Sequence, residues 1–231
     1  HLLRRQRQMC IRDRFFNDSY KNLKSILKEL KLESVDGILL DLGLSSFQLE
    51  DNKRGFSHKF QSSLDMRFDK NSTNNTAEKI VHQNDLKELT KIFKEYGEER
   101  HAYKIAKRIK ELNDKVDVFA ITSVVDQVTP FKYRLKTYSR IFQALRIATN
   151  DELNHLKFFL DNFIDLLSPQ GRIVVISYHS IEDRIVKHKF KDLKNKKKMN
   201  LIYKKPLIPS KEEVCLNKRA RSAKMRVGEK I

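Results

Sequence analysis

Two short apolar runs, about 130 residues apart, constrain the fold of this 231-residue chain more than any other feature. Residues 35–41 read VDGILLD, and residues 172–177 read RIVVIS. The first run leads into the polar stretch Gly43–Ser46, and the second follows the turn sequence at residues 168–171. A continuous apolar run bounded by turn residues is typical of a strand buried in a parallel sheet. The pattern therefore predicts an α/β fold with two central parallel strands.

Most of the chain between these strands has the spacing of amphipathic helices. The β-branched stretch from Val118 to Val128 fits a strand or a helix by its period, and we interpret it as a helix because its neighbours are helical. The predicted helices span residues 23–30, 85–128 in several pieces, about 140–147, 151–167 and 180 to about 190, with a basic connection at 130–140 and two short final strands at 201–203 and 223–227.

The charge of the chain is large and unevenly distributed. The net charge is +18, of which residues 1–14 carry +4 and residues 187–231 carry +12. A lysine or arginine placed on a phosphate releases counterions whatever the base sequence, so the basic end predicts contact with nucleic acid. A solvated basic tail is the alternative interpretation.

Cysteine content and hydropathy indicate a cytoplasmic protein. Cys10 and Cys215 are the only cysteines, which is too few for a disulfide framework or a structural zinc site. No apolar run approaches the ~20 residues needed to cross a bilayer, and the first residues lack a signal peptide. We therefore expect no membrane association.

Polar residues follow the first predicted strand, where open α/β sheets bind their ligands. Asp41 ends the strand, and Ser45, Ser46 and Gln48 lie just beyond Gly43. This cluster could hold a polar cofactor and a nucleobase amine together. Alternatively, its short side chains satisfy only turn and cap amides.

The second predicted strand is followed by Tyr178 and His179, which could stack on a base and hydrogen bond to it. Ser180 and Asp183 have the spacing of a capping box, so we expect Ser180 to begin the next helix. A lone histidine is more often structural than functional. A metal site is not expected, because His179 and His188 do not share the i, i+4 spacing and no partner cysteines are present.

Longer strings in the sequence resemble successive blocks of a known family. The strings are DGILLDLGLSSFQLED, RGFSHKFQSSLDMRFD, YGEERHAYKIAKRI, RIFQALRIATNDEL, GRIVVISYHSIEDRIVKHKF, KKPLIPSKEEV and KRARSAKMRV. In this order, from about Phe15 to Ile231, they resemble the RsmH (MraW) family of bacterial methyltransferases, which act on cytosine N4 in the decoding region of 16S ribosomal RNA. The resemblance implies a class I (Rossmann-like) S-adenosylmethionine-dependent methyltransferase fold with a helical insertion that binds substrate.

The resemblance also assigns domains and partners. Residues 15–52 and 138–231 would form the methyltransferase core, and residues 53–137 would form the insertion. Residues 1–14 do not resemble the family and are expected to be a disordered leader. The implied cofactor is S-adenosylmethionine, and the implied partner is 16S ribosomal RNA or the small ribosomal subunit.

Cofactor contacts of the family fall on Asp41, Gln48 and Tyr20. Tyr20 stands where many relatives have phenylalanine, and Phe47 stands where many have proline. Because Asp41 is assigned to the cofactor, our hypothesis is that Ser45, Ser46 and His179 contact the target base.

One departure from the family concerns its first strand and glycine-rich loop, which hold the cofactor's methionine end and precede an acidic ribose ligand. No such loop occurs in these 231 residues, in which six glycines are scattered. We therefore expect an N-terminally truncated core with an uncovered sheet edge and weak cofactor binding. The alternative function is a non-catalytic module that binds RNA or the ribosome.

Overall fold

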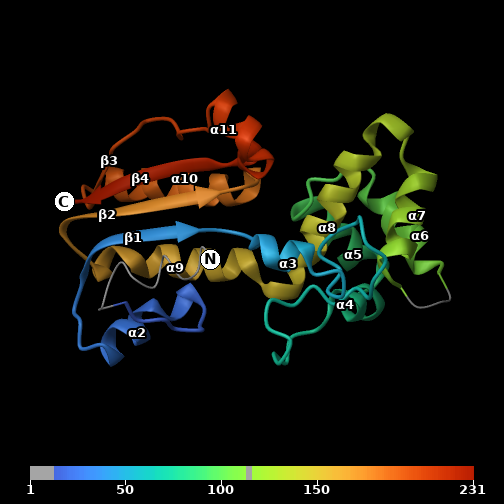
Figure 1. Cartoon of the computed structure of the whole chain (residues 1–231), viewed down its shortest axis with the longest axis horizontal. Helices are drawn as coiled ribbons and strands as arrows, with labels where there is room; N and C mark the ends of the chain where they lie inside the picture. The colour runs from blue at the N-terminus through green and yellow to red at the C-terminus, as the bar shows by residue number, and fades with distance from the viewer. Residues whose placement is uncertain (1–12, 113–115) are drawn as a thin grey trace.

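The computed structural model describes residues 13–112 and 116–231, which form a mixed sheet with helices beside it and a helical part at one end (Figure 1). The strand order is β1-β2-β4-β3, with β1 and β2 parallel and β4 antiparallel to both of its neighbours. The strands are β1 (Val35–Asp41), β2 (Leu167–Ser177), β3 (Met199–Leu201) and β4 (Lys224–Lys230). This architecture confirms the predicted α/β class, and the helical part is inserted between the two parallel strands.

The helices fall into two groups along the chain. Those near the sheet are α2 (Leu23–Glu29), α9 (Glu152–Asn162), α10 (Ser180–Asn195) and α11 (Lys211–Leu216), with 3-10 turns at Tyr20–Asn22, Phe163–Leu166 and Lys218–Ser222. The helical part contains α4 (Ala77–Gln83), α5 (Leu86–Glu95), α6 (Ala102–Lys110), α7 (Val118–Val128) and α8 (Arg134–Asn150), with a 3-10 turn at Phe131–Tyr133. The short α3 (Ser46–Glu50) lies between the end of β1 and the helical part (Figure 1).

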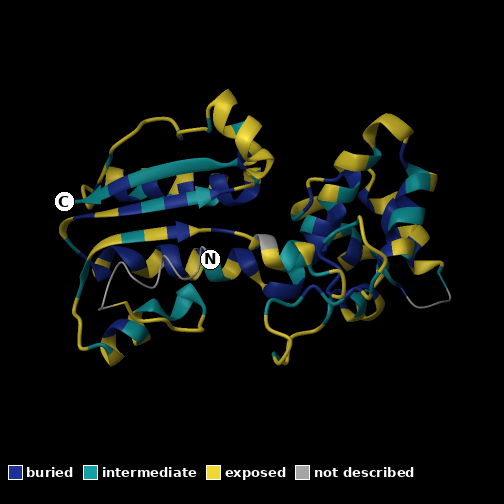
Figure 2. Ribbon diagram, in the orientation of Figure 1, coloured by how far each residue is buried: buried dark blue, intermediate teal, exposed yellow. Residues whose placement is uncertain are grey.

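One face of the sheet packs on α9 and α10. Residues alternate across a strand, so Ile173 and Val175 of β2 are buried on this face beside Leu40 of β1. Phenylalanines from the helices complete the cluster: Phe159, Phe163 and Phe190. Figure 2 shows this buried layer along the strands and the helices next to them.

The opposite face of β1 is open among the described residues. Leu39, which is paired with Val174 of β2, lies on that face and is 69% exposed. Within the described part of the chain, β1 pairs only with β2, so it is an edge strand. An exposed leucine on an unpaired edge is unusual, because such edges favour association with another strand.

The helical part has its own core, drawn from α4 to α8 and from the irregular segment before them. Leu64, Met66 and Phe93 are fully buried there. Helix α7 confirms the helical interpretation of Val118–Val128, and the carboxylate of Asp117 caps its first turn. A small third cluster of Ile147, Leu153 and Ile181 joins this part to the helices on the sheet.

Several predicted boundaries are wrong in detail. Helix α8 begins at Arg134, inside the expected basic connection, because Pro130 lies before the helix and the residues after it can be helical. The helix expected to reach Leu167 ends at Asn162, and Leu167 already belongs to β2.

The predicted turn at residues 168–171 lies within β2 as an irregularity. The pairing passes from Val35 with Leu167 to Gly37 with Arg172, and Gln170 has a φ of 62°. The extra residues bulge out of the ladder, so the turn signal is correct but the strand begins before it. The last two strands also differ by a few residues from the predicted ranges 201–203 and 223–227.

Candidate functional site

The carboxyl ends of β1 and β2 meet at the edge of the sheet that faces α3 and the helical part (Figure 1). Asp41 is paired with Ile176, and the amide of Leu42 continues the ladder by donating to the carbonyl of Ile176 at 3.0 Å. The residues that follow each strand are therefore held side by side, as expected for a ligand site in an open α/β sheet.

A side-chain hydrogen bond links the two strand ends. The phenol of Tyr178 donates to Asp41 Oδ1 at 3.0 Å. Partial burial, this hydrogen bond and the charge of Asp41 raise the pKa of Tyr178 to about 12, so the phenol stays protonated at neutral pH. Gly43, with a φ of 97°, turns the chain beside the Tyr178 ring, and a Cβ there would lie 3.7 Å from Cδ2.

Ser45 and Gln48 form a capping box at the start of α3. The amide of Gln48 donates to Ser45 Oγ at 3.2 Å, and the amide of Ser45 donates to Gln48 Oε1 at 3.1 Å. Ser45 thus caps α3, which is the structural role that its place in the sequence also allowed. The side chain of Ser46 lies outside what the structure describes.

His179, rather than Ser180, is the N-cap of α10, so the predicted capping box is wrong by one residue. The amide of Glu182 donates to His179 Nδ1 at 3.4 Å, which places the ring proton on Nε2. His179 Nε2 lies 3.1 Å from Glu182 Oε1, but without the alignment of a hydrogen bond. Asp183, the expected capping partner, instead pairs with Arg226.

Glu182, Glu152 and Arg146 form a group of largely buried charges next to His179. Burial raises the pKa of Glu182, but contact with His179 and the charge of Arg146 outweigh it, so the pKa is lower than usual. Burial also raises the pKa of Glu152, and the ion pair with Arg146 at 2.8 Å only partly offsets this effect. Glu182 therefore remains the anion that faces the imidazole.

Tyr20 lies at the start of the described helices near the sheet, with the edge of its ring against Phe159. Burial raises the pKa of Tyr20 above its usual value, and the nearby carboxylates of Glu152 and Glu182 add to this effect. The structure thus places Tyr20 close to Glu152 and Glu182, which lie next to His179. Among the described contacts, none joins Tyr20 to Asp41 or Gln48.

The helical part contacts the beginning of α10 through Glu98, in the loop between α5 and α6. Glu98 accepts hydrogen bonds from Ser180 Oγ at 2.5 Å and from Arg184 Nη2 at 2.7 Å. These hydrogen bonds lower the pKa of Glu98, so it is ionised at neutral pH. The sequence indicated Tyr178 as a residue that could stack on a base, but it did not indicate the hydrogen bond to Asp41, and it did not single out Glu98 or Glu182. Of Glu98 and Glu182, only Glu182 left a local signal, since it lies three residues after the true cap.

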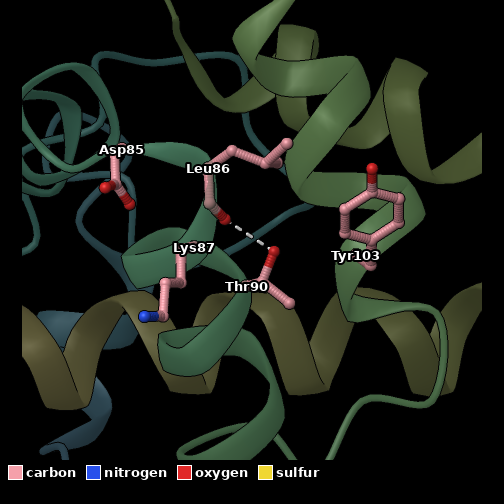
Figure 3. Close-up of a pocket in the computed structure, with 5 residues that line it drawn as sticks. All are labelled: Asp85, Leu86, Lys87, Thr90 and Tyr103. Atoms are coloured by element: carbon pink, nitrogen blue, oxygen red, sulfur yellow. Dashed lines mark hydrogen bonds between the residues drawn. The ribbon is translucent and has the colours of Figure 1, made fainter.

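An open hollow of about 450 Å³ lies between α5 and α6 (Figure 3). Its lining is mainly apolar, with Leu86 and Tyr103 beside Thr90, whose hydroxyl donates to the Leu86 carbonyl. No predicted site residue lines it. Within residues 13–112 and 116–231, no three histidine, cysteine or acidic side chains are grouped as metal ligands. None of the helices in these two ranges combines the length and the hydropathy of a membrane span.

Comparison with known proteins gives matches over nearly the whole chain. The model of the MraW methylase family matches residues 4–231. The protein named ribosomal RNA small subunit methyltransferase H from Dictyoglomus turgidum is 46% identical over 234 residues, which cover 99% of this chain and 78% of the relative. The proteins of that name from Halothermothrix orenii and Dictyoglomus thermophilum are 43% and 48% identical, over 94% and 93% of this chain and 76% and 72% of the relatives.

Proposed function

Because this chain belongs to the MraW methylase family, we propose that it methylates the N4 amine of a cytosine in the decoding region of 16S ribosomal RNA. The names of its relatives support the ribosomal RNA of the small subunit as the substrate. The observation that carries the proposal is the junction of the two strand ends, where Tyr178 binds Asp41 and is followed by His179. The proposed substrate-binding insertion is residues 53–137 and the proposed core is residues 15–52 and 138–231, so helix α8 (Arg134–Asn150), which packs in the helical part, crosses the boundary between them.

The polar groups at this junction suit S-adenosylmethionine. Asp41 uses Oδ1 for Tyr178, and its second carboxylate oxygen has no hydrogen bond among the described residues. Gln48 uses only its carbonyl oxygen in the capping box, which leaves the amide nitrogen as a donor. We propose that these two groups and Tyr20 hold the cofactor, which supplies an electrophilic methyl group when bound.

Ser45, Ser46 and His179 are our proposed contacts to the cytosine. The exocyclic amine is a poor nucleophile because its lone pair is delocalised into the ring. An acceptor bonded to an N4 hydrogen would localise that pair, and Ser45 Oγ keeps a second lone pair for this purpose beside the one used by Gln48. Holding an extruded base in line would supply much of the remaining rate.

The test must separate catalysis from helix capping, because Ser45 and His179 both cap helices. Glycine and asparagine are tolerated at N-caps, so the informative variant is S45G/S46A/H179N. We expect single-turnover methylation of small subunits, at saturating S-adenosylmethionine, to fall by about 100-fold or more. The urea midpoint should change little, and an unchanged rate would overturn the assignment of these three residues.

A non-catalytic RNA-binding module is the second candidate, favoured by the +12 charge of residues 187–231. Binding to small subunits that falls steeply with salt, without any methyl transfer, would support this candidate.

A further inference from the structure

A small hollow of about 110 Å³ lies between α10 and the β3–β4 end of the sheet. Its floor includes the buried ring of Phe190. Its rim carries Lys187 and Lys191 from α10, Lys204 and Tyr203 from the segment after β3, and Arg226 from β4. We call these residues the basic groove. The proposed cytosine contacts do not line it.

Three cations of the basic groove lack a carboxylate partner. Arg226 is neutralised by Asp183 at 2.7 Å, but no carboxylate in the described part of the chain lies within 4.0 Å of Lys187, Lys191 or Lys204. Of the other lysines of α10, Lys189 lies 2.6 Å from Asp161, whereas Lys194, about one turn beyond Lys191, also has no carboxylate within 4.0 Å in the described part of the chain. The hollow therefore brings together three unpaired cations, two from the helix and one from the segment after β3.

The arrangement of Lys187 and Lys191 suits a repeating anion. They are four residues apart on α10, so they share one face of the helix with ~5 to 6 Å between their Cβ atoms. Both are exposed, as is Lys204 across the hollow. Closely spaced like charges favour the binding of an anion that bridges them.

Tyr203 adds an aromatic surface to these charges. Its side chain is 48% exposed and has no hydrogen bond among the described residues. It follows β3 in an irregular segment, next to the exposed Ile202. An exposed ring bordered by cations is the usual platform on which proteins stack the bases of single strands.

The groove lies within reach of the proposed methylation site along one helix. Helix α10 begins at Ser180, next to His179, and a helix rises ~1.5 Å per residue. Lys187 and Lys191 therefore lie about 10 and 17 Å along α10 from the strand ends. An RNA strand with its target base near His179 could extend a few nucleotides and meet the groove.

We infer that the basic groove binds the backbone of single-stranded RNA flanking the methylated cytosine, with one base stacked on Tyr203. Lys187, Lys191 and Lys204 contact phosphates, and these contacts do not depend on base sequence. The inference rests on the proposed function for the identity of the RNA. Binding to the groove itself requires no cofactor, so it can be measured on this chain alone.

The first test neutralises the two helix lysines. Binding of a fluorescent 12-nucleotide single-stranded RNA is followed by anisotropy over a range of salt concentrations. We expect K187Q/K191Q to weaken binding by at least about 10-fold at low salt and to reduce the salt slope by about 1.4, since each single-strand phosphate contact contributes ~0.7. The matched control is K24Q/K28Q, which removes an exposed i, i+4 lysine pair from α2. Equal losses in the two variants would overturn the inference.

The second test concerns the ring. Y203A should weaken RNA binding by about 5- to 100-fold, and Y203F should bind like the wild type because the ring is kept. If Y203A has no effect, and polyglutamate displaces the RNA as well as an RNA of equal charge does, the groove is a surface for acidic proteins and the inference fails.

The two proposals fail in different ways. If RNA binding depends on Lys187, Lys191 and Tyr203 but the wild type transfers no methyl group, the proposed function is contradicted. RNA binding by the basic groove is then still supported. Methyl transfer by a chain whose RNA affinity is unchanged in K187Q/K191Q would contradict the groove alone. Circular dichroism melting of each variant checks that these exposed substitutions leave the fold intact.

Discussion

The phenol of Tyr178 donates a hydrogen bond to Asp41 Oδ1 at 3.0 Å, across 137 residues of sequence. This contact fixes one oxygen of a carboxylate that would otherwise rotate freely at the end of an edge strand. The oriented second oxygen is then available for a ligand, which makes Tyr178 a positioning residue for Asp41.

The variant Tyr178→Phe tests this role. Its ring is partly exposed, so loss of the hydrogen bond should lower the free energy of unfolding by no more than about 1 kcal/mol. Methyl transfer at limiting S-adenosylmethionine should fall by about 10-fold, because Asp41 loses its orientation. The control is Tyr103→Phe, an exposed tyrosine in the helical part, which should be silent in both assays. A similar loss in the two variants would contradict the positioning role.

A second prediction concerns the affinity of these 231 residues for the cofactor. Leu39 is 69% exposed, and β1 has a neighbour on one side only among the described residues. A ligand site at the end of such a strand has a neighbouring strand on one side only. We therefore expect S-adenosylmethionine to bind much more weakly than with a micromolar dissociation constant. Isothermal titration calorimetry measures this directly, and a micromolar dissociation constant would show the prediction to be wrong.

The α/β class and both central strands could be predicted because their signals are local. The run from Val35 to Asp41 is apolar and ends at a turn, and the strand begins and ends where the pattern indicates. Helix α7 could be predicted only from its neighbours, since β-branched residues fit both structures. The start of β2 could not be predicted, because a turn sequence within a strand becomes a bulge only when a partner strand holds it.

The site could be predicted less well than the fold. The strand ends pointed to Asp41 and His179, but the cap of α10 was placed on Ser180, since serine is a better N-cap than histidine in general. In the structure, the hydroxyl of Ser180 instead donates a hydrogen bond to Glu98, which belongs to the helical part. Such a partner, 82 residues away, leaves no trace in local spacing.

The pair of Asp183 and Arg226 predicts a stability that depends on pH. Burial raises the pKa of Asp183, but Arg226 and Lys224 outweigh it and leave the pKa below its usual value. A carboxyl group with a depressed pKa in the folded state stabilises the protein above its unfolded pKa of ~3.9, and this contribution is lost as the pH falls through the lower folded pKa.

Asp183→Asn should therefore lower the free energy of unfolding at pH 7 by roughly 2 to 4 kcal/mol, because it leaves the mostly buried Arg226 without its partner. Urea denaturation at about pH 7 and again well below about pH 4 should show the difference from the wild type shrinking in acid. Asp161→Asn is the matched control, since Asp161 pairs with Lys189 at an exposed position and should cost less than about 1 kcal/mol. A loss in D183N that is the same at both pH values would count against the ionic origin.

Gly97→Ala should be among the more destabilising single substitutions in the helical part. A Cβ at this position would lie 2.7 Å from the carbonyl oxygen of Arg140 and 2.8 Å from that of Phe93, and both are backbone atoms that cannot move alone. Helix α8 would have to shift, which we expect to cost at least about 2 kcal/mol. The shift would also displace Glu98, the next residue, from Ser180 and Arg184. Gly37→Ala is the control, because its nearest atom would be 3.8 Å away, and its urea midpoint should remain close to that of the wild type. If Gly97→Ala unfolded at the same urea concentration as Gly37→Ala, α8 would not be held against this loop as tightly as the structure indicates.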